Sequence, residues 1–332
     1  MISKGCEQCA AGGKLVVFVH GFCDERDCFY CPLGDTRKNV SQSFANERPI
    51  QSTEDLLTEA RVMDALGASI TGGEPQEEID LTCEYINGLK KEFGNEFHIH
   101  LYTGITGDRS SMRRLAKAGL DEIRFHPPID RWGNLHGTEW EDILYIAADE
   151  GITPAFEIPG IKPEPEFIEF LDEGAAAFCN INEFEISDGN YERMHEHGYA
   201  REPEHMSAVE GSKSDALFQQ MVSHPKVYFC TSVFKDAAQH RRRLKRMAET
   251  IQRDFDDITD DGTIVYGKTW TTPGKLEQLG VPDEFYTVKQ DHIEIAWWLL
   301  EEMIREGDIR RGEIVEQYPT YDGTVVERTP LA

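Results

Sequence analysis

Three cysteines lie close together near the start of the chain, in a stretch that also contains two aromatic residues. Cys23, Cys28 and Cys31 follow the apolar run of residues 15–19, which predicts a buried strand. Three thiolates on a loop after a strand can hold an iron–sulfur cluster and leave one iron without a protein ligand. A small molecule can bind to such an iron and receive an electron. The pattern therefore indicates chemistry rather than a purely structural role.

A structural zinc site is the alternative for these cysteines. Zinc would need a fourth ligand, which His20, Cys6 or Cys9 could supply. This alternative leaves unexplained the Gly-Gly-Glu-Pro sequence of residues 72–75, which follows a second short strand at 68–71. Alone, that sequence would be an ordinary strand-ending turn, but its occurrence together with the cysteine loop favours the iron–sulfur interpretation.

The other cysteines divide into two kinds. The chain has eight cysteines and five of them fall in the first 31 residues, which in a protein of this size favours metal or redox chemistry over a disulfide framework. Cys6 and Cys9 form a Cys-x2-Cys pair that could hold zinc or an auxiliary cluster, or could be a surface thiol pair. Two ligands do not close a tetrahedral site, and Cys230 could complete one only if the fold brings it near. Cys83 and Cys179 lie in apolar stripes and are expected in the core.

Strands and helices alternate through the first 190 residues. The expected strands are 14–20, 68–71, 97–102, 122–126, 154–158 and 177–186, and the expected helices are 53–66, 77–92, 110–118, 139–149 and 165–171. Repeated strand–helix units predict an α/β fold with a parallel sheet, open or closed into a barrel. Loops at the carboxyl ends of such strands meet on one face, so the cysteine loop, the Gly-Gly-Glu-Pro turn and the loop after Tyr102 should come together.

Residues 191–332 are predicted to form a C-terminal α/β extension, following a first domain of residues 1–190. The extension should contain strands at 227–230 and 263–266 and helices at about 234–254 and 290–305. Residues 241–246 are a basic cluster in an otherwise acidic chain. They indicate either a solvated helix face or a site for an anionic substrate, such as RNA or a phosphorylated metabolite.

The charge and hydropathy of the chain bear on its surroundings. The net charge is −27, which hinders non-specific nucleic-acid binding and suggests adaptation to the salt-rich cytoplasm of a halophilic archaeon, with an ordinary acidic mesophile as the alternative. No run of eighteen apolar residues exists, so no membrane span is predicted. The first residues lack the apolar region of a signal peptide, so a cytoplasmic location is expected.

The cysteine loop and the glycine turn together resemble the radical S-adenosylmethionine superfamily over about residues 14–190. The resemblance rests on Cys-x4-Cys-x2-Cys with Tyr30 before its last cysteine, and on Gly-Gly-Glu-Pro after the next strand. The usual spacing in that family is Cys-x3-Cys-x2-Cys, so this chain has one extra residue in the first gap. With the opening Cys-x2-Cys pair, the chain is similar to archaeal relatives of the pyruvate formate-lyase activating enzyme. The resemblance implies a partial (βα)6 TIM-like barrel.

The resemblance also implies the cofactors. Cys23, Cys28 and Cys31 would ligate a [4Fe–4S] cluster, and its fourth iron would chelate the amino and carboxylate groups of S-adenosylmethionine. Gly72 and Gly73, which have no Cβ, would let the backbone approach the methionine moiety.

Other implied contacts to S-adenosylmethionine come from side chains at the strand ends. Glu74 would lie near the amino group, and Tyr30 or Phe29 would pack near the adenine. Arg124 and His126 are weaker candidates for ribose or carboxylate contacts. Weaker still are three residues of the sixth strand, Asn180, Asn182 and Glu183.

The implied reaction is reductive cleavage of S-adenosylmethionine to methionine and a 5′-deoxyadenosyl radical that abstracts hydrogen from a substrate. A reductant such as ferredoxin would supply the electron. The substrate could be a small molecule, a protein or RNA, because the C-terminal region carries no recognisable chemical signature. The alternative function is a zinc-binding, RNA-associated module without catalysis.

Overall fold

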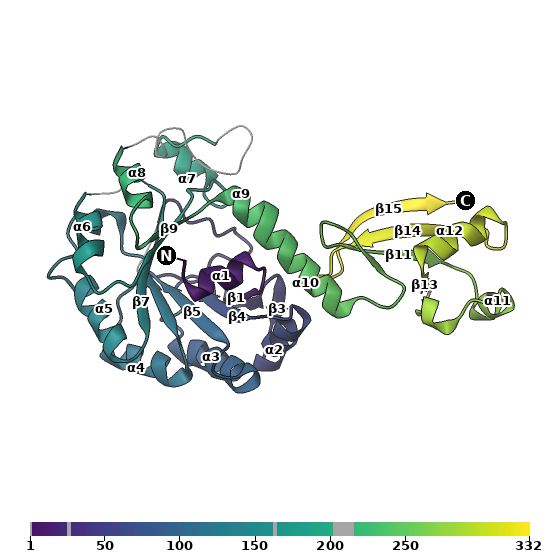
Figure 1. Ribbon diagram of the computed structural model, residues 1–332, viewed down its shortest axis with the longest axis horizontal. Helices are drawn as coiled ribbons and strands as arrows, with labels where there is room; N and C mark the ends of the chain where they lie inside the picture. The colour runs from purple at the N-terminus through teal and green to yellow at the C-terminus, as the bar shows by residue number, and fades with distance from the viewer. Residues whose placement is uncertain (1, 25–27, 162–164, 202–215) are drawn as a thin grey trace. The chain divides into compact units, whose positions relative to one another are not determined.

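The computed structural model describes residues 2–24, 28–161, 165–201 and 216–332. The chain divides into two compact units, which are described separately (Figure 1). The first comprises Met1–Arg61 and Ala65–Gln239, and the second comprises Val62–Asp64 and His240–Ala332.

A curved, mostly parallel sheet forms the centre of the first unit. Its strand order is β3-β2-β1-β4-β5-β6-β7-β8-β9, with parallel pairing from β1 to β9 and an antiparallel β2–β3 hairpin at one edge. The strands are β1 (Lys14–Phe18), β2 (Ser43–Ala45), β3 (Arg48–Ile50), β4 (Gly67–Thr71), β5 (His98–Thr103), β6 (Glu122–Phe125), β7 (Thr153–Pro159), β8 (Cys179–Asn182) and β9 (Val227–Cys230). This arrangement confirms the predicted α/β class with a partial TIM-like barrel.

Helices cover the convex face of the sheet, while one helix lies on its concave side (Figure 1). The outer helices are α2 (Thr53–Val62), α3 (Ile79–Phe93), α4 (Arg109–Ala118), α5 (Glu139–Asp149) and α6 (Pro165–Glu173). Helix α1 (Lys4–Ala10) packs inside, against β1, β4 and β5. Shorter helices are η1 (Ile129–Arg131), α7 (Tyr191–Glu196), α8 (Ala216–Val222), α9 (Ser232–Phe234) and η2 (Lys235–His240).

Alternation along the strands sorts side chains between the two faces of the sheet. Ile99 and Leu101 of β5 and Ile123 and Phe125 of β6 are fully buried, as the core between sheet and helices requires. The alternate positions of the same strands are polar, and they face the concave side, where α1 lies. The barrel interior is therefore polar, although it is buried.

Strand β9 extends the sheet beyond the part predicted from the sequence. It pairs in parallel with β8, with Cys179 opposite Val227 and Asn182 opposite Cys230. Because of this pairing, the first compact unit continues to Gln239, past the boundary expected at residue 190.

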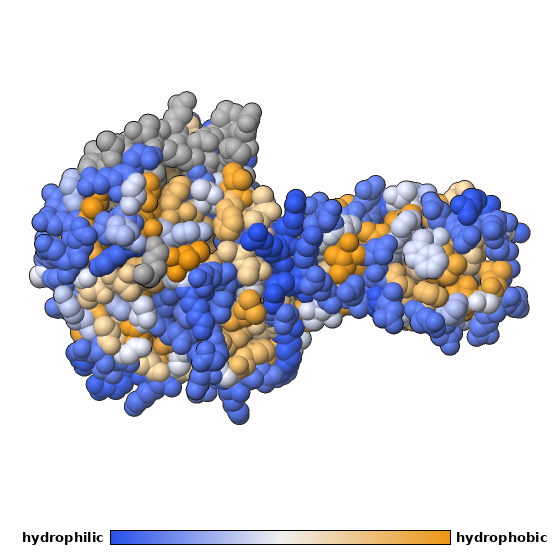
Figure 2. Space-filling view, viewed as in Figure 1, coloured by the Kyte–Doolittle hydropathy of each residue, from blue (hydrophilic) through white to orange (hydrophobic). Residues whose placement is uncertain are grey.

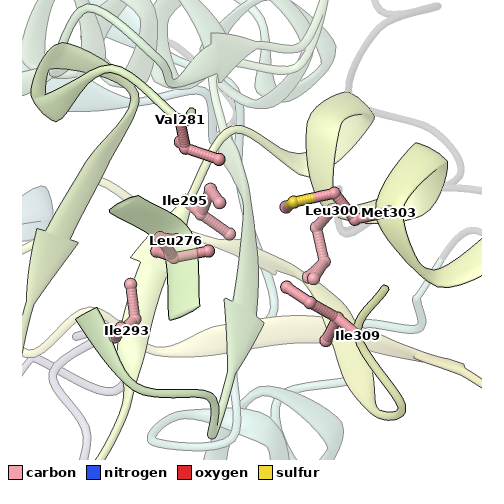
Figure 3. Close-up of a cluster of buried hydrophobic side chains, with 7 residues drawn as sticks. All are labelled: Leu276, Val281, Ile293, Ile295, Leu300, Met303 and Ile309. Carbon is pink, nitrogen blue, oxygen red and sulfur yellow. The ribbon is translucent and has the colours of Figure 1, made fainter. Parts of the chain in front are cut away.

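The second unit has its own antiparallel sheet, in the order β12-β13-β11-β14-β15, with β10 also paired to β11. Its strands are β10 (Asp257–Ile258), β11 (Ile264–Thr269), β12 (Tyr286–Val288), β13 (Ile293–Ile295), β14 (Gly312–Gln317) and β15 (Val325–Leu331). Its helices are α10 (Arg241–Ile251), α11 (Pro273–Gln278), η3 (Asp283–Phe285) and α12 (Trp297–Arg305). Figure 3 shows a core cluster of this unit, which consists of Leu276, Val281, Ile293, Ile295, Leu300, Met303 and Ile309.

Part of the helix expected at 290–305 is a strand instead. Ile293 and Ile295 lie on one face of β13, which pairs with β11 and β12, and the helix begins only at Trp297. The spacing of Ile293 and Trp297 suits a helix, but the strand pairing prevails over that local pattern.

The surface of the molecule agrees with its composition. Figure 2 shows hydrophilic residues over most of the visible face, as expected for a chain with a net charge of −27. Within the described residues, no helix is both long enough and apolar enough to cross a membrane.

Candidate functional site

A cavity of about 240 Å³ lies where the loops after β1, β4 and β5 meet, and we call it the outer cavity. The three cysteines of the loop after β1 line it together with the glycine turn after β4. The full lining is Gly21, Cys23, Cys28, Cys31, Leu33, Lys38, Asn39, Thr71, Gly72, Gly73, Glu74, Tyr102, Thr103, Gly104 and His126. The fold thus brings the two sequence motifs to one site.

The glycine turn fits directly against the cysteine loop. The N–H of Gly73 donates to the carbonyl of His20 at 2.6 Å, and the N–H of Glu74 donates to the carbonyl of Phe22 at 2.8 Å. A Cβ added to Gly73 would lie 1.6 Å from the Phe22 carbonyl oxygen, and one added to Gly72 (φ +152°) would lie 2.6 Å from that of His20. Both glycines are therefore required by the close contact between the two loops.

The side chain of Glu74 fixes a third loop to this contact. Its carboxylate accepts hydrogen bonds from Thr103 Oγ1 at 2.8 Å and from the N–H groups of Gln76 at 3.0 Å and Gly104 at 2.6 Å. Burial raises the pKa of Glu74, although these hydrogen bonds favour the charged form. The carboxylate thus holds the loop after β5, and its expected contact with an amino group stays a prediction.

Tyr30 and His126 connect the cysteine loop to the end of β6. The Tyr30 hydroxyl lies 2.6 Å from His126 Nε2, and His126 Nδ1 lies 2.8 Å from the Glu157 carbonyl oxygen. Phe29 stacks on His197, with ring centroids 4.0 Å apart, so it faces α7. His126 lines the outer cavity. The expected roles of Tyr30 and His126 beside S-adenosylmethionine stay predictions.

The donor set of the outer cavity fits a thiolate-ligated cluster. Cys23, Cys28 and Cys31 are half-buried on one wall, and the double glycine is on the facing loop. No three Cys, His, Asp or Glu side chains of the described residues are already arranged around a single metal ion. Thiolates are the usual protein ligands of iron–sulfur clusters, so the three cysteines of this lining suit such a group.

A second cavity, of about 210 Å³, lies inside the barrel, and we call it the inner cavity. Its lining comes from α1, from five strands of the sheet and from η2, and Tyr102 lines both cavities. The lining residues are Gly5, Cys6, Cys9, His100, Tyr102, Arg124, Glu157, Asn180, Asn182, Tyr228, Cys230, Lys235 and Gln239. Arg124, Asn180 and Asn182, considered above for S-adenosylmethionine, therefore line this cavity and not the outer one. Glu183 is buried elsewhere, with its carboxylate bonded to Ser232.

Arg124 is the centre of a buried charge network beside the inner cavity. Its guanidinium, 2% exposed, pairs with Glu122 at 2.5 Å and with Glu157 at 2.7 Å. Burial opposes its charge, but Tyr102, Glu157 and Glu122 outweigh this effect and raise the pKa of Arg124 well above its ordinary value. The amide groups of Asn180 and Asn182 also donate to Glu157.

Several other titratable groups in the barrel interior have pKa values that are shifted so as to favour their neutral forms. Burial lowers the pKa of Lys14 to about 7, and its ammonium donates to the His98 carbonyl at 2.7 Å. Burial and the nearby Lys14 lower the pKa of His98 to about 3. Burial also raises the pKa of Cys9 to about 11 and that of Cys230 to about 12. These thiols are therefore neutral at pH 7 unless a cation compensates for the loss of the proton.

The inner cavity is not among the features expected from the motifs, but strand β5 carries a sequence signal for it. In β5, the polar His98, His100 and Tyr102 alternate with the apolar Ile99 and Leu101. A parallel sheet covered on both faces normally has nearly continuous apolar strands, so alternation in a central strand indicates a polar interior.

The chain is similar to known proteins over most of its length. A protein of Methanocaldococcus jannaschii, provisionally described as a glycyl-radical enzyme activating enzyme, is 34% identical over an alignment of 353 residues, which covers 99% of this chain and 93% of the relative. A family model described as a domain of unknown function (DUF8061) matches residues 262–331.

Two solved structures are partly similar. Streptococcus suis SuiB bound to S-adenosylmethionine gives a TM-score of 0.45 at 14% identity, covering 66% of this chain and 50% of that one. The radical S-adenosylmethionine methyltransferase TsrM of Kitasatospora setae, with tryptophan and an S-adenosylmethionine analogue bound, gives 0.37 at 15% identity, covering 53% and 37%. This chain therefore matches half or less of each of those chains.

Proposed function

This chain belongs to the radical S-adenosylmethionine superfamily of enzymes, and on that premise we propose that its outer cavity binds a [4Fe–4S] cluster together with S-adenosylmethionine. Cys23, Cys28 and Cys31 would ligate the cluster. The observation that carries the proposal is that these three thiols and the Gly72–Gly73 turn line the same cavity. The family makes the chain an enzyme, so the non-catalytic zinc-binding module is set aside.

When bound, the cluster and S-adenosylmethionine supply a one-electron reductive cleavage that yields methionine and a 5′-deoxyadenosyl radical, with the electron coming from a reductant such as ferredoxin. The residues of this chain position the cofactors. The hydrogen bonds of Gly73 and Glu74 to the backbone of the cysteine loop hold that loop in place. Tyr30 and His126 anchor its far end, and Glu74 fixes the loop after β5. This framework would limit the access of water to a reactive intermediate.

We further propose that the substrate is a protein, from which a hydrogen atom passes to the 5′-carbon and leaves a carbon radical on a glycine. The description of the Methanocaldococcus jannaschii relative supports this class of substrate. The basic cluster of residues 241–246 gives little support for RNA. Arg241 pairs with Asp261 at 2.8 Å, and Lys245 lies 3.5 Å from Asp260, so these cations already face carboxylates.

Cleavage of S-adenosylmethionine tests the core of the proposal. The protein would be reconstituted anaerobically with iron and sulfide, reduced with dithionite and assayed for 5′-deoxyadenosine. We expect product from the native protein, none from Cys28→Ala, and nearly native amounts from Cys83→Ser, whose side chain lies on α3 away from the outer cavity. No product from the native protein would refute the proposal, and equal product from Cys28→Ala would refute the ligand assignment.

The class of substrate needs a second assay. Extract fractions from the source organism would be added to the reduced enzyme, and the increase in 5′-deoxyadenosine over the basal rate would be measured. We expect the increase to disappear when the fractions are first treated with protease, which is then inactivated. It should persist when the fractions are first treated with ribonuclease. Sensitivity to ribonuclease alone would indicate RNA, and an increase that passes a dialysis membrane would indicate a small molecule.

A further inference from the structure

We propose that the inner cavity is a separate zinc site, in which Cys6, Cys9 and Cys230 bind the ion together with His100. Cys230 lies far from the Cys6–Cys9 pair in the sequence, yet all three cysteines line this one cavity. Cys6 and Cys9 come from α1, His100 from the centre of β5, and Cys230 from the end of β9. Three thiolates and one imidazole form a donor set typical of structural zinc.

The surroundings of Cys6 suit a thiolate. Its sulfur accepts a hydrogen bond from Asn180 Nδ2 at 3.0 Å, and Arg124 Nη2 lies 3.7 Å from it. Cys6 itself is buried. Donors aimed at a buried sulfur stabilise negative charge on it, as the outer partners of metal-bound thiolates do.

His100 provides an independent observation. It is 1% exposed, its Nε2 lies 2.9 Å from the Tyr102 hydroxyl, and its Nδ1 has no hydrogen-bond partner among the described residues. A Cβ added to Gly5 would lie 2.6 Å from that Nδ1 and 2.8 Å from Arg124 Nη2, so the nitrogen faces α1 at Gly5, with Glu122 Oε1 4.0 Å away. A metal-bound histidine typically bonds one ring nitrogen to a neighbour and gives the other to the metal.

The four side chains line one cavity, but they do not surround a single point in this structure. In the described residues, no three of them form a ready-made metal-ion site. Coordination of an ion therefore requires the cysteine side chains to rotate within the cavity. A closed site of this kind has no open position for a substrate, so the ion would be structural and would tie α1 to β9 across the barrel.

Zinc content in a variant that lacks the outer thiols tests the proposal. The full chain carrying Cys23→Ala, Cys28→Ala and Cys31→Ala would be purified without chelators, and its zinc and iron would be measured by mass spectrometry. We expect about one zinc ion per chain. Adding Cys6→Ser and Cys9→Ser should remove it, whereas adding Cys83→Ser should not, and circular dichroism would verify that each variant is folded.

Cobalt substitution tests the ligand set. In the same background, Co²⁺ should give thiolate charge-transfer bands and tetrahedral ligand-field bands, weakened by Cys230→Ser and shifted by His100→Gln. A folded background variant without metal would overturn the proposal. So would iron with broad absorption near ~400 nm, because that would identify an auxiliary cluster. A spectrum unchanged by His100→Gln would remove that residue from the site. Neither measurement requires cleavage of S-adenosylmethionine, so failure here leaves the proposed function untouched.

Discussion

The outer and inner cavities are lined by different parts of the chain: one largely by loop backbone, the other largely by polar side chains. Loop backbone and glycines shape much of the outer cavity, and its three cysteines come from one loop. Charged and polar side chains from α1, the sheet and η2 shape the inner cavity, and many of them are buried. Tyr102 belongs to both linings. A site at loop ends can admit and release a small molecule, whereas a buried network of opposite charges holds its parts in place.

The two cavities should also respond differently to substitution. In the outer cavity, a single added methyl group collides with backbone that cannot move away easily. In the inner cavity, loss of one charge leaves its partner buried and uncompensated. Substitutions in the outer cavity should therefore mainly reduce activity, and loss of a charge in the inner cavity should mainly reduce stability.

The largest effect is expected from a ligand of the outer cavity. Cys28→Ala should abolish 5′-deoxyadenosine formation, because two thiolates hold an iron–sulfur cluster poorly. It should leave any metal of the inner cavity in place, as metal analysis of the same sample would show. Loss of metal from both cavities would mean that the two sites are not independent.

The second largest effect on activity is expected from a substitution that makes a side chain collide with backbone in the outer cavity. Gly73→Ala places a Cβ against the Phe22 carbonyl oxygen, so the cysteine loop must shift, and the rate of cleavage should fall roughly 100-fold. Gly34→Ala is the matched control, because its Cβ would meet nothing within 4 Å. Initial rates of 5′-deoxyadenosine formation check both variants. Similar rates for the two would contradict the importance of the loop contact.

A broken charge network should mainly affect the stability of the barrel. Arg124→Met leaves Glu122 and Glu157 without their buried partner and should lower the free energy of unfolding by about 3–5 kcal/mol. Arg109→Met removes an exposed ion pair with Asp149 and should change the free energy of unfolding only a little. Urea unfolding, monitored by circular dichroism, measures the stability of both variants against the native protein. Equal losses would argue against a special role for the buried network.

The smallest effect is a dependence of stability on pH. The pKa of Lys14 is about 7 in the folded protein and 10.5 ordinarily, so between these values the unfolded chain binds the proton that the folded chain has lost. Stability should therefore rise with pH above about 7, by at most about 1.4 kcal/mol per pH unit. Above pH 9 the raised pKa of Cys9 acts in the opposite direction.

Urea unfolding at pH 7 and at pH 8.5 would show this rise. In Lys14→Met the rise should be smaller than in the native protein, since the titrating group is gone. An identical rise in the variant would assign the effect to another group.

The outer cavity could be predicted from the sequence because its motifs are local. The cysteine loop and the Gly-Gly-Glu-Pro turn each follow a strand, and parallel strands deliver their carboxyl ends to one face. The inner cavity could not be predicted in the same way. Cys6, His100 and Cys230 line one cavity only because of strand register and the position of α1, and neither is encoded in a short segment.

The number of strands in the sheet of the first unit also could not be predicted from local sequence patterns. The sequence of residues 227–230 predicts a strand, but it does not indicate that this strand pairs with β8. The glycines of the turn were expected to make room for a ligand, whereas the structure shows that they also make room for the backbone of His20 and Phe22. The halophilic habitat inferred from the charge stays a prediction.

The position of α1 has a consequence for how the chain folds as it is made. Cys6 bonds to Asn180, a partner 174 residues later, and shares its cavity with Cys230 at the end of the last strand of the sheet. Closing so long a loop is slow, so α1 would be among the last elements to settle, since its partners are synthesised much later than it is. Until then its two thiols would remain accessible to oxidants, and these two thiols should be oxidised more readily in newly synthesised protein than in the folded form.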